Sequence, residues 1–321
     1  MNVFEWSAAE LAQKIKAGEL SAPEAVEAVI AAIDSKDGTY NCYTLLNKEA
    51  ALQQAETVQS RIDAGEALSP LAGVPIGIKD NICTKGQLTT CASKILTGFK
   101  PPYNATVIEK LHAAGMIPLG KLNMDEFAMG STTETSFYGA TKNPWNTDRV
   151  PGGSSGGTGA SIACNIGIIG LGTDTINSVR SPSSANSLVG IRPTIGLVSR
   201  AGIVPYSLTQ DTAGPICRTV EDAVRCLDVI KGYDPDDAET AWSVGHEECY
   251  MDHLNVDGMK GRRIGVLESL FGKEEINEST NKVVRNALKV FEENGATLVP
   301  VTDNIDQPWL TSEVSVHLDD F

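Results

Sequence analysis

Apolar residues in the first third of the chain recur every three or four positions. Leu11 and Ile15 show this spacing, and Val26, Ile30 and Ile33 continue it further along. Side chains at that interval lie on one face of an α-helix, which can then pack against a core. The pattern predicts helices over residues 8–17 and 23–34, and a third around residues 52–62.

Capping signals precede the first two of these helices. In Ser7-x-x-Glu10 and Ser21-x-x-Glu24 the serine hydroxyl can accept a free backbone N–H, while the glutamate reaches back to the serine N–H. Each signal marks where a helix begins. Residues 1–65 are therefore predicted to form an N-terminal helical layer.

Beyond this layer the pattern changes to short runs rich in isoleucine and valine, separated by glycine and proline. The runs lie at residues 73–79, 116–119 and 166–171, and they alternate with helical stretches at residues 106–114 and 220–230. Short apolar strands that alternate with helices are typical of an α/β sheet covered by helices. We expect one continuous α/β core over these residues.

The chain after residue 233 begins with an acidic stretch, residues 234–239, whose composition predicts a solvated turn or loop. A strand, helix, strand unit follows at residues 263–267, 276–293 and 297–301. We expect this unit to extend the same sheet. Residues 66–321 are accordingly predicted to be one continuous structural domain.

Composition narrows the classes of partner. The chain has 26 basic and 41 acidic residues, a formal net charge of -15, which repels phosphate backbones and anionic membrane surfaces. No direct nucleic-acid partner is expected. The sequence contains neither a signal-peptide pattern nor a run of 18 apolar residues, so no membrane partner is expected either. Seven scattered cysteines without a C-x-x-C pair indicate reduced thiols and a cytoplasmic setting.

Three polar features interrupt the apolar runs. Residues 151–157 are too rich in glycine and serine for a regular element, so they form a loop, and a flexible linker is one interpretation of it. A second polar turn, residues 172–175, follows a buried run and brings Ser178 near a strand end. Lys79 closes the apolar segment 74–78, where a lysine is either solvent-facing or buried with a lowered pKa.

These motifs together resemble the amidase signature family. The resemblance covers residues 71–230 and rests on Gly77-Ile-Lys-Asp-Asn81, on Pro151 to Gly157, and on Gly172 to Arg180 followed by Val189 to Thr194. Lys79 precedes Ser154 by 75 residues and Ser154 precedes Ser178 by 24, the separations found in that family. The resemblance implies a mixed central sheet covered by helices on both faces, with the family's C-terminal part missing.

The resemblance also assigns catalytic roles. Lys79 is implied as the base, Ser154 as a bridging serine that follows a cis peptide bond, and Ser178 as the nucleophile. Backbone N–H groups of Thr175, Ile176, Asn177 and Ser178 are implied as the oxyanion hole. The chemistry is coherent, since a serine hydroxyl needs an adjacent proton acceptor and a buried lysine can be neutral enough to serve. No metal or organic cofactor is implied.

The segment 120–131 resembles the part of the family that lines the acyl pocket. Met129, Gly130 and Ser131 are implied as the residues nearest the substrate. Within this segment Asp125 and Glu126 are adjacent acids, a pattern typical of a solvated helix start rather than of paired-carboxylate catalysis.

The nucleophile turn departs from the family at Ile176 and Asn177, where two glycines are usual. A position that needs positive φ would strain a β-branched isoleucine and suit asparagine better, so the turn is either remodelled or weaker in catalysis. Asp174 and Arg180 are predicted to brace this turn. Ser155 is predicted to have a structural role in its loop or at the following helix.

A literal G-x-S-x-G at residues 152–156 raises the alternative of an α/β-hydrolase elbow. That motif needs a strand directly before it, and residues 143–150 are rich in turn formers instead. His246, His253 and His317 lie in polar surroundings typical of surface residues. Phosphate-binding loops are excluded because the stretch has neither a G-K-[ST] ending nor a G-x-G-x-x-G ladder.

Three functions remain open. The first is an amidase that hydrolyses a small-molecule carboxamide through an acyl-serine. This interpretation also allows a homodimer. The second is the glutamine-hydrolysing A subunit of a glutamyl-tRNA(Gln) amidotransferase, which residues 124–130 and 143–145 resemble; Ile176, Asn177 and residues 179–182 resemble stand-alone amidases more. The third is an inactive, truncated amidase-like protein, since family members continue well past Phe321.

Overall fold

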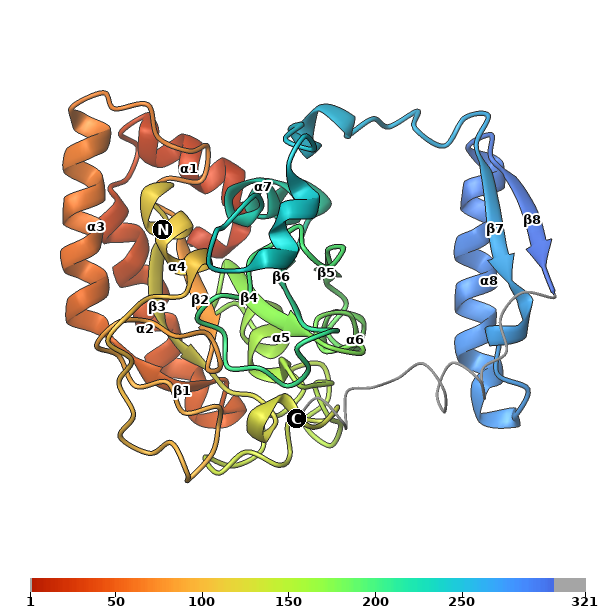
Figure 1. The fold of residues 1–321 in the computed structure, drawn as a ribbon, viewed down its shortest axis with the longest axis horizontal. Coiled ribbons are helices and arrows are strands. Elements are labelled where there is room, and N and C mark those ends of the chain that lie inside the picture. Colours follow the sequence, from red (N-terminus) through yellow and green to blue (C-terminus); the bar gives the residue numbers. More distant parts are fainter. Residues whose placement is uncertain (1, 303–321) are drawn as a thin grey trace. The chain divides into compact units, whose positions relative to one another are not determined.

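The computed structural model describes residues 2–302, which divide into two compact units, residues 2–251 and 252–302. The first unit is built on a six-stranded sheet with the order β1-β3-β2-β4-β6-β5 (Figure 1). Its strands are β1 Tyr43–Leu46, β2 Pro75–Lys79, β3 Ile117–Leu122, β4 Ile169–Asp174, β5 Val189–Gly190 and β6 Thr212–Cys217. Strands β3, β2 and β4 are parallel while β1, β6 and β5 are antiparallel to their neighbours, so the sheet is mixed, as expected.

Helices cover both faces of this sheet. They are α1 Ala8–Lys16, α2 Ala22–Tyr40, α3 Lys48–Asp63, α4 Thr106–Ala113, α5 Gly156–Ala163, α6 Arg180–Ala185 and α7 Val220–Ile230. Short 3-10 helices occur at Val3–Glu5, Glu126–Ala128, Ala238–Ser243, Tyr250–His253, Glu268–Leu270 and Glu275–Asn277. Both predicted capping boxes are formed, at Ser7 and Ser21. The predicted domain boundary after residue 65 stays a prediction.

Helix α2 extends beyond its predicted end at residue 34. Its last two turns are polar, and Asn41 ends it in the left-handed conformation with φ of 56°. The Asp37 carboxylate accepts the backbone N–H groups of Cys42 at 2.6 Å and Tyr43 at 3.2 Å. These bonds hold the chain as it turns into β1, and no periodicity of apolar residues could reveal them.

Strand β6 was not predicted, because its sequence Thr-Ala-Gly-Pro-Ile-Cys shows no alternation of apolar and polar residues. All six residues are nevertheless buried, and the strand pairs with β4 from Gly170↔Ile216 to Asp174↔Thr212. A strand buried on both faces needs no alternation. This segment forms a strand because β4 provides the backbone groups with which it pairs.

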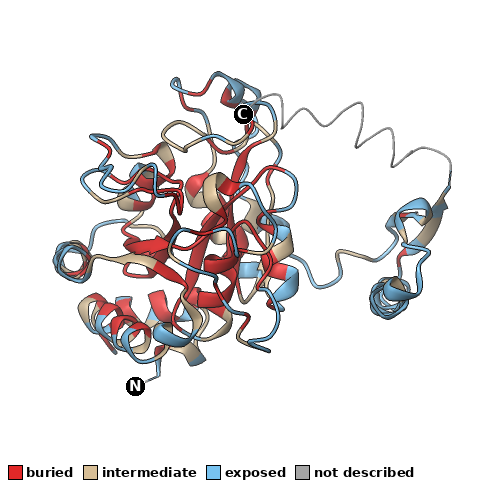
Figure 2. Cartoon of the chain, turned by 90° about the horizontal axis from the view of Figure 1, so that it is seen from below, coloured by how far each residue is buried: buried red, intermediate tan, exposed pale blue. Residues whose placement is uncertain are grey.

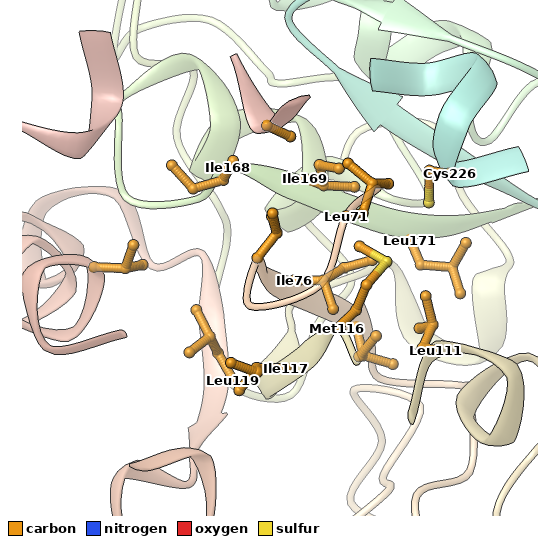
Figure 3. Packing of buried hydrophobic residues seen from close by; sticks show 14 of the residues in the cluster. Leu71, Ile76, Leu111, Met116, Ile117, Leu119, Ile168, Ile169, Leu171 and Cys226 are labelled. Carbon is orange, nitrogen blue, oxygen red and sulfur yellow. The ribbon is translucent and has the colours of Figure 1, made fainter. Parts of the chain in front are cut away.

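The two faces of the sheet are packed differently. Ile76, Ile169 and Leu171 meet Leu111 of α4 and Cys226 of α7 in an apolar cluster (Figure 3). Buried residues are concentrated in and around this sheet (Figure 2). The cluster is the apolar core of the first unit.

The opposite face carries glycines where α5 crosses it. A Cβ added to Gly170 would lie 2.4 Å from the Thr158 side chain, and one added to Gly172 would lie 2.9 Å from the Ser155 hydroxyl. Because these positions have no side chain, α5 and the loop before it lie directly on the sheet. This close approach brings residues 151–155 to the ends of β2 and β4.

The strand, helix, strand unit predicted near the C-terminus is present as β7 Arg263–Leu267, α8 Glu278–Glu293 and β8 Thr297–Val301. Our expectation that it extends the central sheet does not match the strand pairing. Within residues 2–302, β7 pairs only with β8, in parallel, in a two-stranded sheet. A helix-linked parallel pair satisfies its own backbone hydrogen bonds along the shared edge, so it forms without a third strand.

The acidic stretch 234–239 contains the predicted turn, and Pro235, Asp236, Ala238 and Glu239 are exposed, but two of its acids are not solvated. Asp234 is buried and accepts the hydroxyls of Thr106 and Ser199, each at 2.5 Å. Asp237 is also buried and forms an ion pair with Arg200 at 2.7 Å. These acids are stabilised by distant hydroxyls and a guanidinium, which the local composition does not reveal.

All seven cysteines are free thiols and five of them are buried. None of the helices within residues 2–302 combines the length and apolar character needed to cross a lipid bilayer.

The close packing of α5 generates a stability prediction. A Cβ at Gly157 would lie 2.5–2.6 Å from backbone atoms of Asn123 and Cys42, which cannot move aside easily. Gly157→Ala should therefore lower the free energy of unfolding by about 1–3 kcal/mol, the usual cost of overpacking. Gly38→Ala, at an open position in α2, should raise it by about 0.5–1 kcal/mol. Urea denaturation of both variants checks this, and equal effects would contradict it.

Candidate active site

Lys79, at the end of β2, is completely buried. Its Nζ lies 2.7 Å from Ser154 Oγ, 2.8 Å from Thr173 Oγ1 and 3.3 Å from the Thr173 carbonyl oxygen. The lysine is therefore buried and not solvent-facing, which decides between the two interpretations that the sequence allows. Its amine has three protein oxygens in place of water.

Burial lowers the pKa of Lys79 from 10.5 to about 7. The cause is desolvation, which penalises the charged ammonium more than the neutral amine. The carboxylates of Asp125, Asp174 and Asp211, and then the Cys91 thiol, act in the opposite direction and limit the fall. A substantial fraction of the amine is neutral near pH 7.

Ser154 follows a cis peptide bond from Gly153, the feature implied by the family resemblance. It is fully buried, and its carbonyl oxygen accepts the Asp125 backbone N–H at 3.1 Å. The next residue joins this loop to the nucleophile turn, because the Ser155 N–H donates to the Ser178 carbonyl at 3.3 Å. The Ser155 hydroxyl donates to the Thr173 carbonyl at 3.2 Å, which is a structural role, as predicted.

Ser178 lies in the turn between β4 and α6, and 5% of its surface is exposed. In the described part of the chain its hydroxyl makes no hydrogen bond to protein, whereas the hydroxyl of Ser154 contacts Lys79. The contact between Lys79 and Ser154 is thus formed, and the two serine loops are joined through backbone, while the roles implied for these residues stay a prediction. Within residues 2–302, the hydroxyls of Ser154 and Ser178 form no hydrogen bond with each other.

The backbone N–H groups of Thr175–Ser178 donate to no protein acceptor within the described residues. They are available to an oxygen placed in the site. Neither Ile176 nor Asn177 has a positive φ. The strain that sequence reasoning raised for the replaced glycines is therefore absent. The role of these groups as an oxyanion hole stays a prediction.

The predicted brace of the nucleophile turn is confirmed. Asp174 is fully buried, and its carboxylate accepts Arg180 Nε and Nη2, each at 3.2 Å, and the Val179 N–H at 3.0 Å. Arg192 Nε adds an ion pair at 3.1 Å. Arg192 stands in the motif Val189 to Thr194, yet its link to Asp174 could not be assigned without the fold.

The interpretation of Asp125 as part of a solvated helix start is wrong. Asp125 is fully buried, and its carboxylate accepts the N–H groups of Thr132 at 3.2 Å and Thr133 at 2.9 Å. The hydroxyl of Thr135 donates to it at 3.0 Å. Protein donors replace water around this carboxylate, which is why burial is tolerated. Glu126, its neighbour, is half-buried.

Met129, Gly130 and Ser131 are exposed and lie beside the Ser154 loop. A Cβ added to Gly153 would come within 2.7 Å of the Ser131 carbonyl carbon. The segment therefore lies at the site, although its role in substrate binding stays a prediction.

Sequence reasoning missed Thr173 and the cavity beside it. The cavity has a volume of about 330 Å³. Its lining includes Thr173, Arg200, Ile203, Pro205, Leu208, Asp211, Thr212 and Asp237. The Asp211 carboxylate also accepts the Thr175 hydroxyl, so the cavity wall and the nucleophile turn are connected. Thr173 stands in the motif Gly172-Thr-Asp-Thr175, which the sequence singled out, whereas no motif marked the lining residues after residue 200.

The alternative of an α/β-hydrolase elbow is not supported by the local structure. Residues 143–150 form turns, and no strand leads into residues 152–156. His246 and His253 are exposed, as predicted. His317 lies outside the described residues.

A mixed sheet covered by helices, with a buried lysine and two serine-bearing loops from three motifs at its strand ends, defines an amidase-type α/β fold. A family model described as Amidase matches residues 24–310. The chain belongs to the amidase family.

The relatives include amidotransferase subunits and a peptide amidase. The chain is 50% identical over 297 residues to the A subunit of glutamyl-tRNA(Gln) amidotransferase of Lachnoclostridium phytofermentans, and 48% over 296 residues to that of Lachnospira eligens. Among solved structures it resembles native peptide amidase from Stenotrophomonas maltophilia, with a TM-score of 0.91 and 33% identity over 99% of this chain and 66% of that one. The amidotransferase A subunit from Thermotoga maritima has a TM-score of 0.80 and 31% identity over 99% and 65%.

The chain is shorter than these relatives. Each alignment with the two curated relatives covers 92% of this chain but only 59% and 61% of theirs.

The lowered pKa of Lys79 predicts how stability depends on pH. Its pKa is about 7 in the folded chain and 10.5 without burial, so between these values the unfolded chain binds more protons, and stability rises with pH. The whole window is worth at most about 5 kcal/mol. Lys79→Met lacks this titration, so the difference in unfolding free energy between wild type and variant should shift in favour of wild type from pH 7 to pH 10. Urea denaturation at several pH values checks it, and a constant difference would count against the buried amine.

Proposed function

We propose that this chain is an amidase that hydrolyses a carboxamide C–N bond through an acyl intermediate on Ser178. The observation that carries the proposal is the buried contact of 2.7 Å between Lys79 Nζ and Ser154 Oγ, at an amine whose pKa is about 7. A base is most effective when its pKa lies near the working pH. Family membership and the three motifs support the same reaction.

The first chemical step is proton transfer through two hydroxyls. Neutral Lys79 accepts the proton of Ser154 as Ser154 accepts that of Ser178, and the Ser178 oxygen attacks the amide carbonyl carbon. Bound substrate is expected to bring the two hydroxyls together, because catalytic hydrogen bonds often tighten only in the substrate complex. A tetrahedral oxyanion results.

The oxyanion is stabilised by the free N–H groups of Thr175–Ser178. One such donor is typically worth about 3–4 kcal/mol in barrier height. Ser154 returns a proton to the nitrogen of the leaving amine, the C–N bond breaks, and an acyl ester remains on Ser178. Water then attacks this ester by the same relay in reverse. Each proton passes between Lys79, the two serine hydroxyls, the leaving nitrogen and the attacking water, so the proposed scheme uses no metal or organic cofactor.

The substrate we propose is a small linear carboxamide. The cavity of about 330 Å³ beside Thr173 is within the size range of small-molecule sites. Met129, Gly130 and Ser131 are proposed to line the acyl side. The chain is further proposed to act in the cytoplasm, and a homodimer stays a prediction that no contact in this structure bears on.

A second candidate function is release of ammonia from glutamine as the A subunit of an amidotransferase. Identities of 48% and 50% to curated proteins of that name favour it. Glutamine carries a primary carboxamide, so the same three residues would perform the cleavage with ammonia as leaving group. The difference lies in the partner, since in this role the chain would deliver ammonia to another protein. An inactive amidase-like protein is the remaining alternative.

Labelling with a fluorophosphonate tests the proposed nucleophile. Intact-mass measurement should find one adduct on wild type, none on Ser178→Ala, and slow labelling of Lys79→Ala because its base is missing. The labelling rate of wild type should fall below about pH 7 as Lys79 becomes protonated. An adduct that persists in Ser178→Ala removes the assigned nucleophile. Absence of any adduct from folded wild type favours the inactive alternative.

Ammonia release separates the two catalytic candidates. If the chain works within an amidotransferase, glutamine hydrolysis should be slow alone and rise at least about tenfold when the other proteins of a glutamyl-tRNA(Gln) amidotransferase are added, because assembly orders the site. A stand-alone amidase should release ammonia from simple primary amides at a rate that these partners leave unchanged. Ser178→Ala is the control for both assays.

A further inference from the structure

The buried carboxylate of Asp125 takes no part in the proton transfers proposed above, yet it touches both loops of the site. We propose that Asp125 is a positioning residue, which holds Ser154 against Lys79 and connects that geometry to the loop of Met129–Ser131. The inference rests on the proposed function for its catalytic consequence. Its structural and electrostatic parts stand on contacts within this chain.

The first contact set runs from Asp125 to the loop after Ser131. Two backbone N–H groups, from Thr132 and Thr133, and the Thr135 hydroxyl donate to this one carboxylate. Thr133 stands at a φ of 58°, a conformation unusual for a β-branched residue. The carboxylate supplies the hydrogen bonds that hold the loop in this shape.

The second contact set runs from that loop to the Ser154 segment. The Thr133 hydroxyl donates to the Gly152 carbonyl at 3.0 Å and accepts the Gly156 N–H at 3.0 Å. The Asp125 N–H donates to the Ser154 carbonyl at 3.1 Å. Ser154 is thus held from both sides of its loop and at its own carbonyl.

Steric fit points to the same role. A Cβ on Gly153 would lie 2.2 Å from Asp125 Oδ2, and one on Gly130 would lie 2.4 Å from Asp125 Cγ. The carboxylate therefore fills the space between the residue before Ser154 and the middle of the proposed acyl-pocket loop. A shift of either loop must displace it.

Charge gives Asp125 a second effect that a merely structural residue would lack. The groups that act on the Lys79 amine are Asp125, Asp174, Asp211 and the Cys91 thiol. Asp174 is paired with two arginines, whereas Asp125 has no basic partner within 4 Å among residues 2–302. Its negative charge therefore favours the ammonium form of Lys79, and its removal should let Lys79 lose its proton at lower pH.

The test compares Asp125→Asn with Glu126→Gln, the neighbouring acid, whose carboxylate forms no ion pair among residues 2–302. Two quantities are measured on each full chain: the titration of Lys79, by NMR of 13C-labelled lysine, and the rate of Ser178 phosphonylation against pH. In Asp125→Asn the Lys79 titration should move to lower pH. Its labelling rate on the alkaline plateau should fall about 100-fold, the usual effect of a misplaced catalytic group. Glu126→Gln should match wild type in both.

The two measurements test the electrostatic part and the positioning part of the proposal separately. An unmoved Lys79 titration in folded Asp125→Asn overturns the electrostatic part, and an unchanged plateau rate overturns the positioning part. If Asp125→Asn loses its near-ultraviolet circular dichroism, Thr135→Val replaces it, because this variant keeps the carboxylate and removes one donor. It should label several-fold more slowly with an unmoved Lys79 titration, and wild-type labelling would overturn the proposal. Wild type that never labels refutes the proposed function alone, since the NMR comparison still decides the effect of Asp125 on Lys79.

Discussion

The desolvation of one amine is the constraint on which this site depends. Lys79 ends a buried strand, where Ser154 and Thr173 replace the water that an ammonium would need. Burial costs free energy, and part of that cost is relieved when the proton leaves. The pKa near 7 is therefore a direct result of where β2 ends and of what covers it. The same lysine at a solvent-exposed position would stay charged and could not accept a proton.

Packing on the glycine face of the sheet makes this burial possible. Gly170 and Gly172 leave no side chains between β4 and α5, so the loop before α5 lies over the strand ends. That loop contains Ser154, and its backbone bonds to the nucleophile turn through Ser155 and Ser178. The glycine-rich composition that suggested a flexible linker is instead what a closely packed, buried loop requires. A side chain at these positions would hold the loop away from the amine.

The sequence could predict the parts of the site that are carried by motifs and the elements that are carried by periodicity. Lys79 and Ser154 are implied by the resemblance of their motifs to the amidase signature family and are in contact, and the helices of the first third follow from their apolar interval. Long-range effects were not predictable. The burial of Asp125 depends on N–H groups from residues 132–133, and β6 depends on pairing with β4. The partners that stabilise this buried acid and this strand lie elsewhere in the chain, so neither composition nor a local sequence pattern reveals them.

The charges around Lys79 explain why its pKa stops near 7. Burial alone would push the amine further toward the neutral form, and the carboxylates of Asp125, Asp174 and Asp211 oppose this. Asp174 is paired with Arg180 and Arg192, so the brace that shapes the nucleophile turn also weakens one of these charges. In the proposed mechanism the amine must first take a proton and then return it to the leaving nitrogen. A much lower pKa would make it a poor acceptor and a much higher one a poor donor, so a balance near neutral pH serves both steps.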